Sequence, residues 1–205
     1  MEHRDTGLPI GAQTDRVDIH DVEVDPASLL AHLARYMFVS RQLDGTEKLI
    51  EVGAGTGYGA MTLSKVASKV VAYDPYVVSS GLNEKWASDR LMFVDSLKDL
   101  ASFDVVVALE VIEHMPREDA DAFLESLKSL GHPRTRWFIS TPRVLPDEDR
   151  TENRKRAHPF EYTFGEFRSV LKDHFNQVHI FQQNDGIISS QNPKMAWNFI
   201  AVCTN

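Results

Sequence analysis

Glycine occupies every second position from Gly53 to Gly59, directly after a short apolar run of β type and before a helical pattern. This order predicts a strand, a glycine-rich turn and a helix, a geometry that presents backbone N–H groups at a helix N-terminus to a ligand. The glycines allow the backbone to approach that ligand closely and to adopt positive φ angles. The loop therefore predicts a nucleotide-binding site.

The acid Glu51, which lies within the strand, indicates the charge of the ligand. The loop alone is ambiguous, because Gly55, Gly57 and Ala60 also satisfy the dinucleotide pattern G-x-G-x-x-G/A. A carboxylate two residues before the first glycine would repel a pyrophosphate and attract an ammonium or a sulfonium. We therefore expect a cationic nucleotide, and an NAD(H)-dependent oxidoreductase is the less favoured enzyme class. A Walker-type G-x-x-x-x-G-K-[ST] sequence is absent, which argues against phosphate transfer.

Three further acids close predicted strands near the same edge. Asp74, Asp95 and Glu110 each come at the end of a β run, and the carboxyl ends of parallel strands meet at one rim of a sheet. Strands often end in Asp because of turn chemistry, so a single acid carries little weight. Four carboxylates on one rim, with Glu51 included, would repel one another unless a cationic or hydroxyl-rich ligand lies among them. Together with the glycine loop they predict the ligand site at this rim.

Alternating strands and helices must position these residues. Helical spacing of apolar residues predicts a helix from 26 to about 43, with Asp25 as its N-cap and Pro26 at its first position. The continuous apolar run 103–110 is typical of a strand buried on both faces. The predicted strands are 48–52, 69–74, 91–95, 103–110, 136–140, 177–182 and 197–203, and the other predicted helices are 60–68, 78–88, 117–130 and 164–175.

This alternation predicts an α/β fold, a single Rossmann-like domain over residues 26–205 with helices on both faces of a seven-stranded, mostly parallel sheet. The last two β runs are joined only by a loop, 184–194, so we expect a C-terminal antiparallel hairpin at one edge. Residues 1–25 are polar and predict an N-terminal arm. Residues 143–157, where five basic residues meet four acids, predict an exposed insertion.

The composition bounds the class of protein. With 205 residues, 42% of them hydrophobic and 25% charged, the chain fits one ordinary globular domain. Its formal net charge of −8 argues against a general nucleic-acid binder and against adhesion to anionic membranes. We find no apolar signal segment and no membrane-length apolar run, so we expect a cytoplasmic protein, either a monomer or a homodimer. The single cysteine, Cys203, lies in an apolar run and is expected to be a buried core thiol.

The sequence from Glu51 to Gly57, Glu-Val-Gly-Ala-Gly-Thr-Gly, resembles the glycine loop of the class I S-adenosylmethionine-dependent methyltransferases. The resemblance includes Asp74, the acid that ends the second predicted strand, and the pair Asp95-Ser96 at the end of the third predicted strand. It covers about residues 26–205 and extends to Leu-Glu-Val-Ile-Glu-His at 109–114 and Ser-Thr-Pro at 140–142. It implies S-adenosylmethionine as the cofactor. The physical argument agrees, because the sulfonium and the ammonium of this cofactor are cationic.

The resemblance also implies roles for individual residues. By it, the glycine loop packs under the methionine and ribose of the cofactor, Asp74 accepts hydrogen bonds from the ribose hydroxyls, and Glu110 faces the methionine end. Asp95 and Ser96 would meet the adenine amino edge. Tyr36 and Arg41, from the preceding helix, would cover the cofactor. The full cofactor-binding set is Tyr36, Arg41, Glu51, Gly53, Ala54, Gly55, Gly57, Asp74, Pro75, Asp95, Ser96 and Glu110.

Methyl transfer is an in-line displacement that requires the nucleophile about 3 Å from the methyl carbon and, for an oxygen nucleophile, a group that removes its proton. His114 directly follows the fourth strand and is the predicted general base, with Glu113 beside it. His158 follows the insertion, where a lid would fold back over the site. Alternatively, Glu113 and His114 only cap the start of the next helix, and His158 only packs against aromatic rings. The histidines expected at the surface or in packing are His3, His20, His32, His132, His174 and His179.

A metal-dependent alternative concerns the same residues. Glu110, Glu113, His114 and His158 resemble the metal-ligand set of the small-RNA 3′-end 2′-O-methyltransferases, and the stretch 158–167 is also similar to theirs. Carboxylates and imidazoles of this kind hold Mn²⁺ or Mg²⁺. However, the E-x-x-E-H pattern also occurs in small-molecule methyltransferases without a metal, and the nearly balanced charge of the insertion offers no RNA track. We therefore expect neither a metal nor a nucleic-acid partner.

The sequence thus predicts an S-adenosylmethionine-dependent methyltransferase that acts on an oxygen of a small-molecule or sugar-like acceptor. The choice of oxygen rests only on His114. The metal-dependent RNA enzyme is the first alternative. The second is a non-catalytic nucleotide-binding module that kept the cofactor site and lost the acceptor site.

Overall fold

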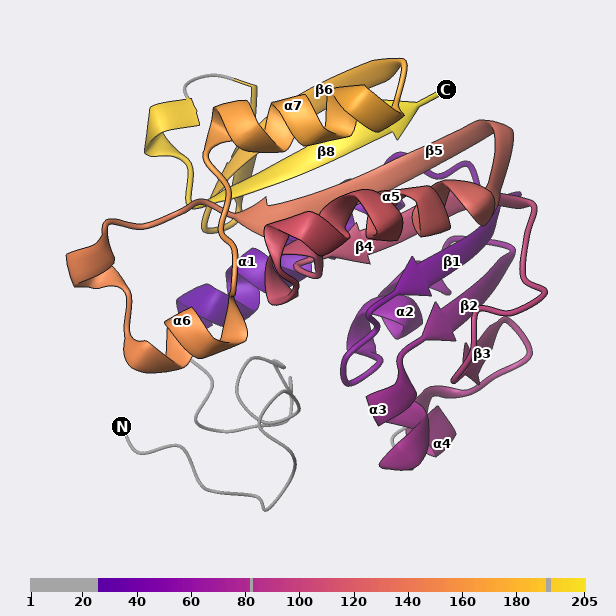
Figure 1. Cartoon of the computed structure of the whole chain (residues 1–205). Coiled ribbons are helices and arrows are strands. Elements are labelled where there is room, and N and C mark those ends of the chain that lie inside the picture. The colour runs from indigo at the N-terminus through magenta and orange to yellow at the C-terminus, as the bar shows by residue number, and fades with distance from the viewer. Residues whose placement is uncertain (1–25, 82, 191–192) are drawn as a thin grey trace.

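Over the described residues, 26–81, 83–190 and 193–205, the computed structural model contains one eight-stranded sheet in the order β3-β2-β1-β4-β5-β8-β6-β7 (Figure 1). The neighbouring strands from β3 to β5 pair in parallel, whereas the pairs β5–β8, β8–β6 and β6–β7 are antiparallel. The strands are β1 (Lys48–Val52), β2 (Lys69–Tyr73), β3 (Leu91–Val94), β4 (Phe103–Leu109), β5 (Gly131–Pro142), β6 (Gln177–Asn184), β7 (Ile187–Ser189) and β8 (Asn198–Thr204).

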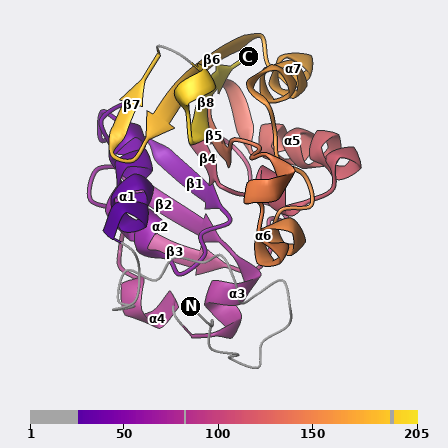
Figure 2. The ribbon, with the colours of Figure 1, turned by 90° about the vertical axis from the view of Figure 1, so that its left-hand side faces the viewer.

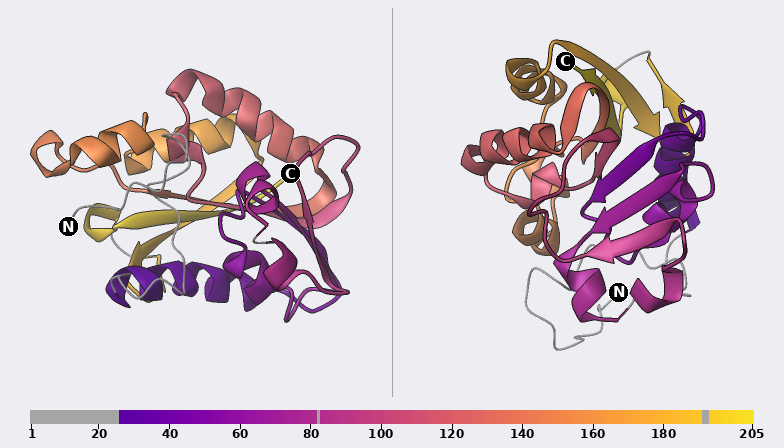
Figure 3. Two further views of the ribbon diagram at one scale, coloured as in Figure 1. Left: turned by 90° about the horizontal axis from the view of Figure 1, so that it is seen from below. Right: turned by 90° about the vertical axis from the view of Figure 1, so that its right-hand side faces the viewer.

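Helices cover both faces of the sheet. Helices α1 (Pro26–Ser40) and α2 (Tyr58–Leu63) lie on one face, and α5 (Ala120–Ser129) and α7 (Phe164–His174) lie on the other (Figures 2 and 3). The short helix α6 (Glu152–Ala157) lies on the side of α5 and α7. Two further short helices, α3 (Pro75–Ser79) and α4 (Asn83–Trp86), lie near β3.

Each face of the sheet has its own hydrophobic core. Trp137, Phe103 and Phe167 are fully buried in the core on the α5 and α7 side. Leu49 and Phe138 belong to the core on the α1 and α2 side. Neighbouring strand residues alternate between the two cores because successive side chains of a strand point to opposite faces. The sheet is therefore buried on both sides, and its ligand-binding groups can lie only at an end of the strands.

Local sequence signals explain where several helices begin. Thr163 precedes α7, and its hydroxyl accepts a hydrogen bond from the backbone N–H of Glu166, whose carboxylate accepts one from the backbone N–H of Thr163 in return. This reciprocal capping stabilises the first turn. Asp74 caps α3 by accepting a hydrogen bond from Tyr76 N at 2.8 Å, and Pro75 occupies the first helical position. Pro75 therefore begins a helix two residues after the end of β2.

The predicted fold class is confirmed, with differences in detail. The eighth strand, β7, lies in the 184–194 segment that the sequence predicted as a loop, because three residues are too few to produce a periodic signal. The last strand, β8, inserts between β5 and β6, so the outermost hairpin is β6–β7. The helix predicted at 78–88 is replaced by α3 and α4, and the 143–157 insertion contains α6.

Several predictions about single segments have a clear outcome. The 103–110 run forms β4 and is buried on both faces as expected. Cys203 is fully buried, and burial raises the pKa of its thiol to about 12. The N-terminal arm 1–25 and its Asp25 N-cap lie outside the described residues. Within the described part of the chain, every helix is too short or too polar to span a lipid bilayer.

Candidate functional site

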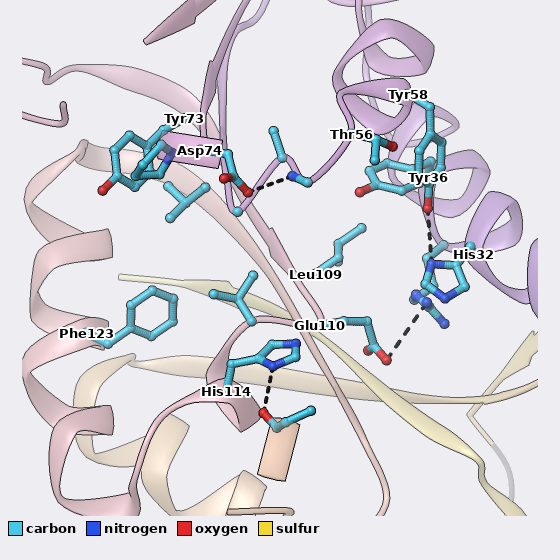
Figure 4. Close-up of a pocket in the computed structure, with 18 of the residues that line it drawn as sticks. His32, Tyr36, Thr56, Tyr58, Tyr73, Asp74, Leu109, Glu110, His114 and Phe123 are labelled. Carbon is cyan, nitrogen blue, oxygen red and sulfur yellow. Dashed lines mark hydrogen bonds and ion pairs between the residues drawn. The ribbon is translucent and has the colours of Figure 1, made fainter. Parts of the chain in front are cut away.

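A cavity of about 470 Å³ opens at the carboxyl ends of β1, β2 and β4, where sequence reasoning placed the ligand rim (Figure 4). This is the edge at which open α/β sheets bind ligands, and the volume is typical of a small-molecule site. The predicted residues that line it are Tyr36, Gly53, Ala54, Gly55, Asp74, Pro75, Glu110 and His114. Lining residues that sequence reasoning did not assign to the site include His32, Arg35, Thr56, Tyr58, Tyr73, Phe123 and Arg156.

The loop between β1 and α2 forms one wall of the cavity. Its three glycines, Gly53, Gly55 and Gly57, have φ angles of 82°, 57° and 86°, a region that L side chains rarely adopt. A Cβ at Gly57 would also come within 2.8 Å of Cδ1 of Trp86. Trp86 in turn donates a hydrogen bond from Nε1 to Thr56 O at 2.9 Å. The glycines are therefore required by the backbone, and the loop is braced from behind.

Asp74 links this loop to the end of β2. Its side chain is 6% exposed, lines the cavity and accepts hydrogen bonds at 2.8 Å from Gly55 N and from Tyr76 N. A carboxylate has about four lone-pair directions, so it can still accept hydrogen bonds from ligand hydroxyls. Asp74 is thus held rigidly in the position where the sequence predicted a ribose acceptor.

Glu51 does not line the cavity, although it was predicted as a cofactor-binding residue. Its side chain is fully buried, and it accepts a hydrogen bond at 2.7 Å from the hydroxyl of Tyr36 on α1. Burial raises the pKa of Glu51 to about 7, and Asp74 contributes to the same shift. Glu51 therefore supports the site from behind, because its residue parity directs its side chain towards α1 and α2 rather than into the cavity.

At the end of β4, Glu110 has a positive φ of 56° and is held by three side chains. Ser140 Oγ donates a hydrogen bond to Oε1 at 2.7 Å, and Asn198 Nδ2 donates one to Oε2 at 2.6 Å. The guanidinium of Arg35 lies 3.9 Å from Oε2 and donates a hydrogen bond to Gln183 Oε1 at 3.1 Å. The cavity thus contains a fixed carboxylate and a fixed cation side by side.

Helix α1 supplies a second, aromatic wall. The rings of Tyr36 and Tyr58 meet edge to face at 5.4 Å, and His32 Nδ1 lies 3.1 Å from the Tyr58 hydroxyl (Figure 4). Burial, with the charge of Arg35 as the second cause, lowers the pKa of His32 to about 4, so its imidazole is neutral near pH 7. His32 was expected at the surface or in packing; it does pack against Tyr58, and it also lines the cavity. Sequence periodicity identified α1 but could not indicate that this side of it faces the cavity.

The predicted acceptor-side residues come together after β4. The ligand atoms of Glu113, His114 and His158 all lie within 4.8 Å of one another, and the two imidazole rings meet edge to face at 4.9 Å. His114 Nδ1 lies 2.8 Å from the carbonyl oxygen of Ala157. A carbonyl can only accept, so Nδ1 carries the proton and the lone pair of neutral His114 is on Nε2. His114 lines the cavity, whereas Glu113 and His158 lie beside it.

Glu113 is 1% exposed, and neither of its carboxylate oxygens meets a hydrogen-bond donor within bonding geometry among the described residues. Burial, followed by the negative charge of Glu110, raises its pKa well above the usual range. A buried carboxyl without hydrogen bonds is unfavourable when ionised, so this environment favours the protonated form of Glu113.

Glu161 holds the segment that carries α6 against this cluster. Its fully buried side chain forms ion pairs with Arg150 Nε at 3.2 Å and Arg154 Nε at 2.5 Å. Its Oε1 also lies 2.9 Å from His158 Nδ1. Burial alone would raise the pKa of Glu161, but His158 and Arg154 outweigh it and hold the pKa below its usual value. The 143–157 segment was expected to be an exposed insertion, and none of its residues is buried; its end at Ala157 also contacts the site.

Three predicted cofactor residues lie away from the cavity. Arg41 follows α1, and Asp95 and Ser96 follow β3; all three are exposed, and none lines the cavity. Gly57 is buried behind the loop and does not line it either. The predicted adenine contacts of Asp95 and Ser96 therefore stay predictions from the resemblance. The missed residue Arg35 had one sequence signal, a cation next to the inward-facing Tyr36 of an apolar helix.

Comparison with known proteins gives matches over most of the chain. A family model described as a methyltransferase domain matches residues 20–183. The ubiquinone biosynthesis O-methyltransferase of Xanthomonas oryzae pv. oryzae is 31% identical over 124 residues, which are 55% of this chain and 50% of that protein. The protein of the same name from Methylocella silvestris is 28% identical over 120 residues, 53% of this chain and 44% of that protein. The chain spans about half the length of the curated relatives it matches.

Several solved structures have a similar fold. The methyltransferase domain of bacterial CtHen1 superposes with a TM-score of 0.63 at 21% identity and covers 85% of this chain and 100% of that chain. A TehB-like SAM-dependent methyltransferase from Corynebacterium glutamicum has a TM-score of 0.64 at 15% identity, and the match covers 84% of this chain and 87% of that chain. A DhpI–SAH complex has a TM-score of 0.62 at 18% identity, and the match covers 89% of this chain and 88% of that chain. At these identities the likeness concerns the fold.

Proposed function

Since this chain belongs to the class I S-adenosylmethionine-dependent methyltransferases, we propose that it transfers the methyl group to an oxygen atom of a small-molecule acceptor. One observation carries the choice of oxygen. His114 lines the cavity with its Nδ1 proton bound to the Ala157 carbonyl at 2.8 Å, so that Nε2 carries the lone pair. An oxygen nucleophile needs such a base, whereas a neutral amine needs mainly positioning.

The residues of the cavity fit the cofactor. The acids Asp74 and Glu110 match its hydroxyls and its cationic groups, and the guanidinium of Arg35, 2% exposed, matches its carboxylate. The loop 53–56 offers a surface without large side chains against which the nucleoside can pack. When bound, S-adenosylmethionine would supply an electrophilic methyl group. Asp74, Glu110 and Arg35 would hold the cofactor in the cavity that His114 also lines.

His114 then acts on the acceptor. Its Nε2 would accept the proton of the acceptor hydroxyl as the oxygen–carbon bond forms and the methyl–sulfur bond breaks, with S-adenosylhomocysteine as the leaving group. The Ala157 carbonyl would stabilise the resulting imidazolium through the Nδ1 proton. Val111 and Phe123 supply apolar surface in the cavity that His114 lines. The relatives' name, O-methyltransferase, supports the same acceptor atom, although this chain spans about half of their length.

The test combines product identification with a histidine variant. Purified protein with radiolabelled S-adenosylmethionine is offered a panel of phenols, catechols and sugars, and the methylated atom is identified by mass spectrometry and NMR. We expect methyl ethers. His114→Ala should lower kcat by about 10²–10⁴-fold and leave S-adenosylhomocysteine affinity nearly unchanged, because the general base acts only on the acceptor. His132→Ala, outside the cavity, is the matched control. Methylation of nitrogen, or full activity of His114→Ala, would contradict the proposal.

A second candidate function is metal-dependent 2′-O-methylation of an RNA 3′ end. One observation favours it: Glu113, His114 and His158 converge within 4.8 Å, and the buried oxygens of Glu113 lack hydrogen-bond donors among the described residues. A divalent cation would satisfy those oxygens and keep Glu113 ionised. Glu110, the fourth residue of the set expected from the sequence, is instead held by Ser140 and Asn198.

Calorimetric titration of metal-free protein with Mn²⁺ tests this candidate. If it is correct, Mn²⁺ binds with a stoichiometry of one, binding is lost in His158→Ala, and methyl transfer to a short oligoribonucleotide requires the metal. His179→Ala, an exposed residue of β6, is the control. Absence of Mn²⁺ binding, together with metal-independent methylation of a small molecule, would eliminate the RNA function and retain the first proposal.

A further inference from the structure

The basic residues of the α6 segment differ in their partners. Arg150 and Arg154 both pair with the buried Glu161, and Lys155 pairs with Glu152 at 3.4 Å. Arg156 donates a hydrogen bond to the neutral side-chain amide of Asn153. Among the described residues, no carboxylate lies within the 4.0 Å of an ion pair from Arg156. The guanidinium of Arg156, at the end of α6, therefore keeps an uncompensated charge.

Arg156 lies at the cavity and beside the candidate base. It is exposed and lines the cavity together with His114, Phe123 and Ala157. Its chain neighbour Ala157 provides the carbonyl that holds His114 Nδ1 at 2.8 Å. Figure 4 shows the ring of Phe123 and the imidazole of His114 on the same side of the cavity. A cation, an aromatic ring and a proton acceptor thus meet where an acceptor molecule would enter.

The two ends of the cavity differ in charge. Asp74 and Glu110 make the cofactor end negative, and the buried Arg35 is already engaged there by Glu110 and Gln183. Arg156 makes the other end positive. A guanidinium presents a planar pair of donors that matches a carboxylate or a phosphate, and this match is better than for an ammonium. An anion bound there would be kept away from the acids of the cofactor end.

We propose that the acceptor carries an anionic group, a carboxylate or a phosphate, which Arg156 binds while the acceptor hydroxyl faces His114. This inference rests on the proposed function, because it assigns the acceptor to the same cavity. Phe123 supplies the apolar surface for the part of the molecule between the anion and the hydroxyl. Arg156 is therefore a specificity-determining residue, and the substrate class is that of small anionic hydroxy compounds.

Calorimetry on protein saturated with S-adenosylhomocysteine tests the inference with matched probe pairs. The carboxylate pair is 3,4-dihydroxybenzoate and its methyl ester, and the phosphate pair is 4-hydroxyphenyl phosphate and hydroquinone, so that every probe carries a phenolic hydroxyl. We expect one of the two anions to bind at least about tenfold more tightly than its neutral partner, as one charge-assisted contact allows. In Arg156→Gln this preference should fall to about twofold or less. Lys155→Gln, which removes a neighbouring charge that does not line the cavity, should keep it.

The outcomes separate this inference from the proposed function. If wild-type protein binds neither anion better than its neutral partner, or if the preference survives in Arg156→Gln, the inference is wrong. If Arg156→Gln weakens binding of a short oligoribonucleotide but of neither small anion, the acceptor is a nucleic acid and the inference is again wrong. Methyl transfer to both members of a pair is measured in parallel. If the protein prefers an anion but transfers no methyl group to oxygen, the inference is supported and the proposed function is wrong. If it transfers methyl groups to oxygen but prefers neither anion, the proposed function is supported and the inference is wrong.

Discussion

Asp74 illustrates how one side chain can serve both fold and ligand. Its two oxygens accept hydrogen bonds from the backbone N–H groups of Gly55 and Tyr76, and so it fixes the loop and begins α3. The same carboxylate also lines the cavity. Glu110 has a similar double role, since Ser140, Asn198 and Arg35 hold it at the end of β4. Each acid is oriented by the protein before any ligand arrives.

At the residue scale, Asp74→Ala should weaken binding of S-adenosylhomocysteine by about 1–3 kcal/mol, because charged hydrogen bonds to the ribose are lost and the loop loses its brace. Isothermal titration calorimetry measures this change. Asp173→Ala, an exposed acid on α7, serves as the control and should bind like the wild type. Unchanged affinity in Asp74→Ala would mean that this residue only caps α3.

The segment from β5 to α7 decides the acceptor side of the cavity. Glu161 holds Arg150, Arg154 and His158, while the carbonyl of Ala157 holds His114. Both imidazoles are held through Nδ1, and neutral His114 therefore carries its lone pair on Nε2. A buried carboxylate surrounded by three cationic or polar partners therefore docks the whole segment, which local sequence reasoning had described as an exposed insertion.

At the element scale, Glu161→Gln should release α6 from the site. We expect faster hydrogen–deuterium exchange over residues 147–161 and a loss of about 1–3 kcal/mol in unfolding free energy, because two guanidinium groups lose their carboxylate. Methyl transfer should fall by a larger factor than cofactor affinity. Glu148→Gln, an exposed acid of the same segment, is the control. Exchange that stays slow in Glu161→Gln would show that packing, not this ion-pair cluster, holds the segment.

The whole molecule contains a buried acid on each side of its sheet, near the ligand edge. Glu51 lies among α1 and α2 residues and accepts a hydrogen bond from Tyr36, whereas Glu113 lies on the other side, beside His114. Burial raises the pKa of both carboxyls. Carboxyls with raised pKa values bind more protons in the folded than in the unfolded state, so they reduce stability as pH rises.

The pH dependence of global stability follows for Glu51. Its pKa rises from 4.5 to about 7 on folding, so the free energy of unfolding falls as pH increases between these values and no longer depends on this carboxyl at higher pH. The expected loss of unfolding free energy is about 3 kcal/mol. Glu51→Gln should therefore gain unfolding free energy relative to wild type, by about this amount, between pH 5 and pH 8 in urea denaturation of the ligand-free protein. Glu118→Gln, an exposed acid, should show no such gain. A pH-independent difference for Glu51→Gln would contradict this assignment.

Much of the architecture was readable from local patterns. The alternation of strands and helices, the glycine loop and the row of acids at strand ends are properties of contiguous residues, and they predicted the edge of the sheet at which the cavity lies. His114 was identified for the same reason, since it directly follows β4. Missed features such as β7 and α6 are too short for their periodicity to stand out.

The tertiary structure alone decided which distant side chains share the cavity. Arg35 and His32 reach it because α1 packs across the sheet next to the glycine loop, and Arg156 reaches it because the buried Glu161 docks its segment. Glu51 faces away, and Asp95 lies beyond the cavity, although both follow the expected pattern. Sequence spacing determines which residues share an element and a face. The packing of one element against another, which depends on contacts between residues far apart in the chain, determines which of those faces meet.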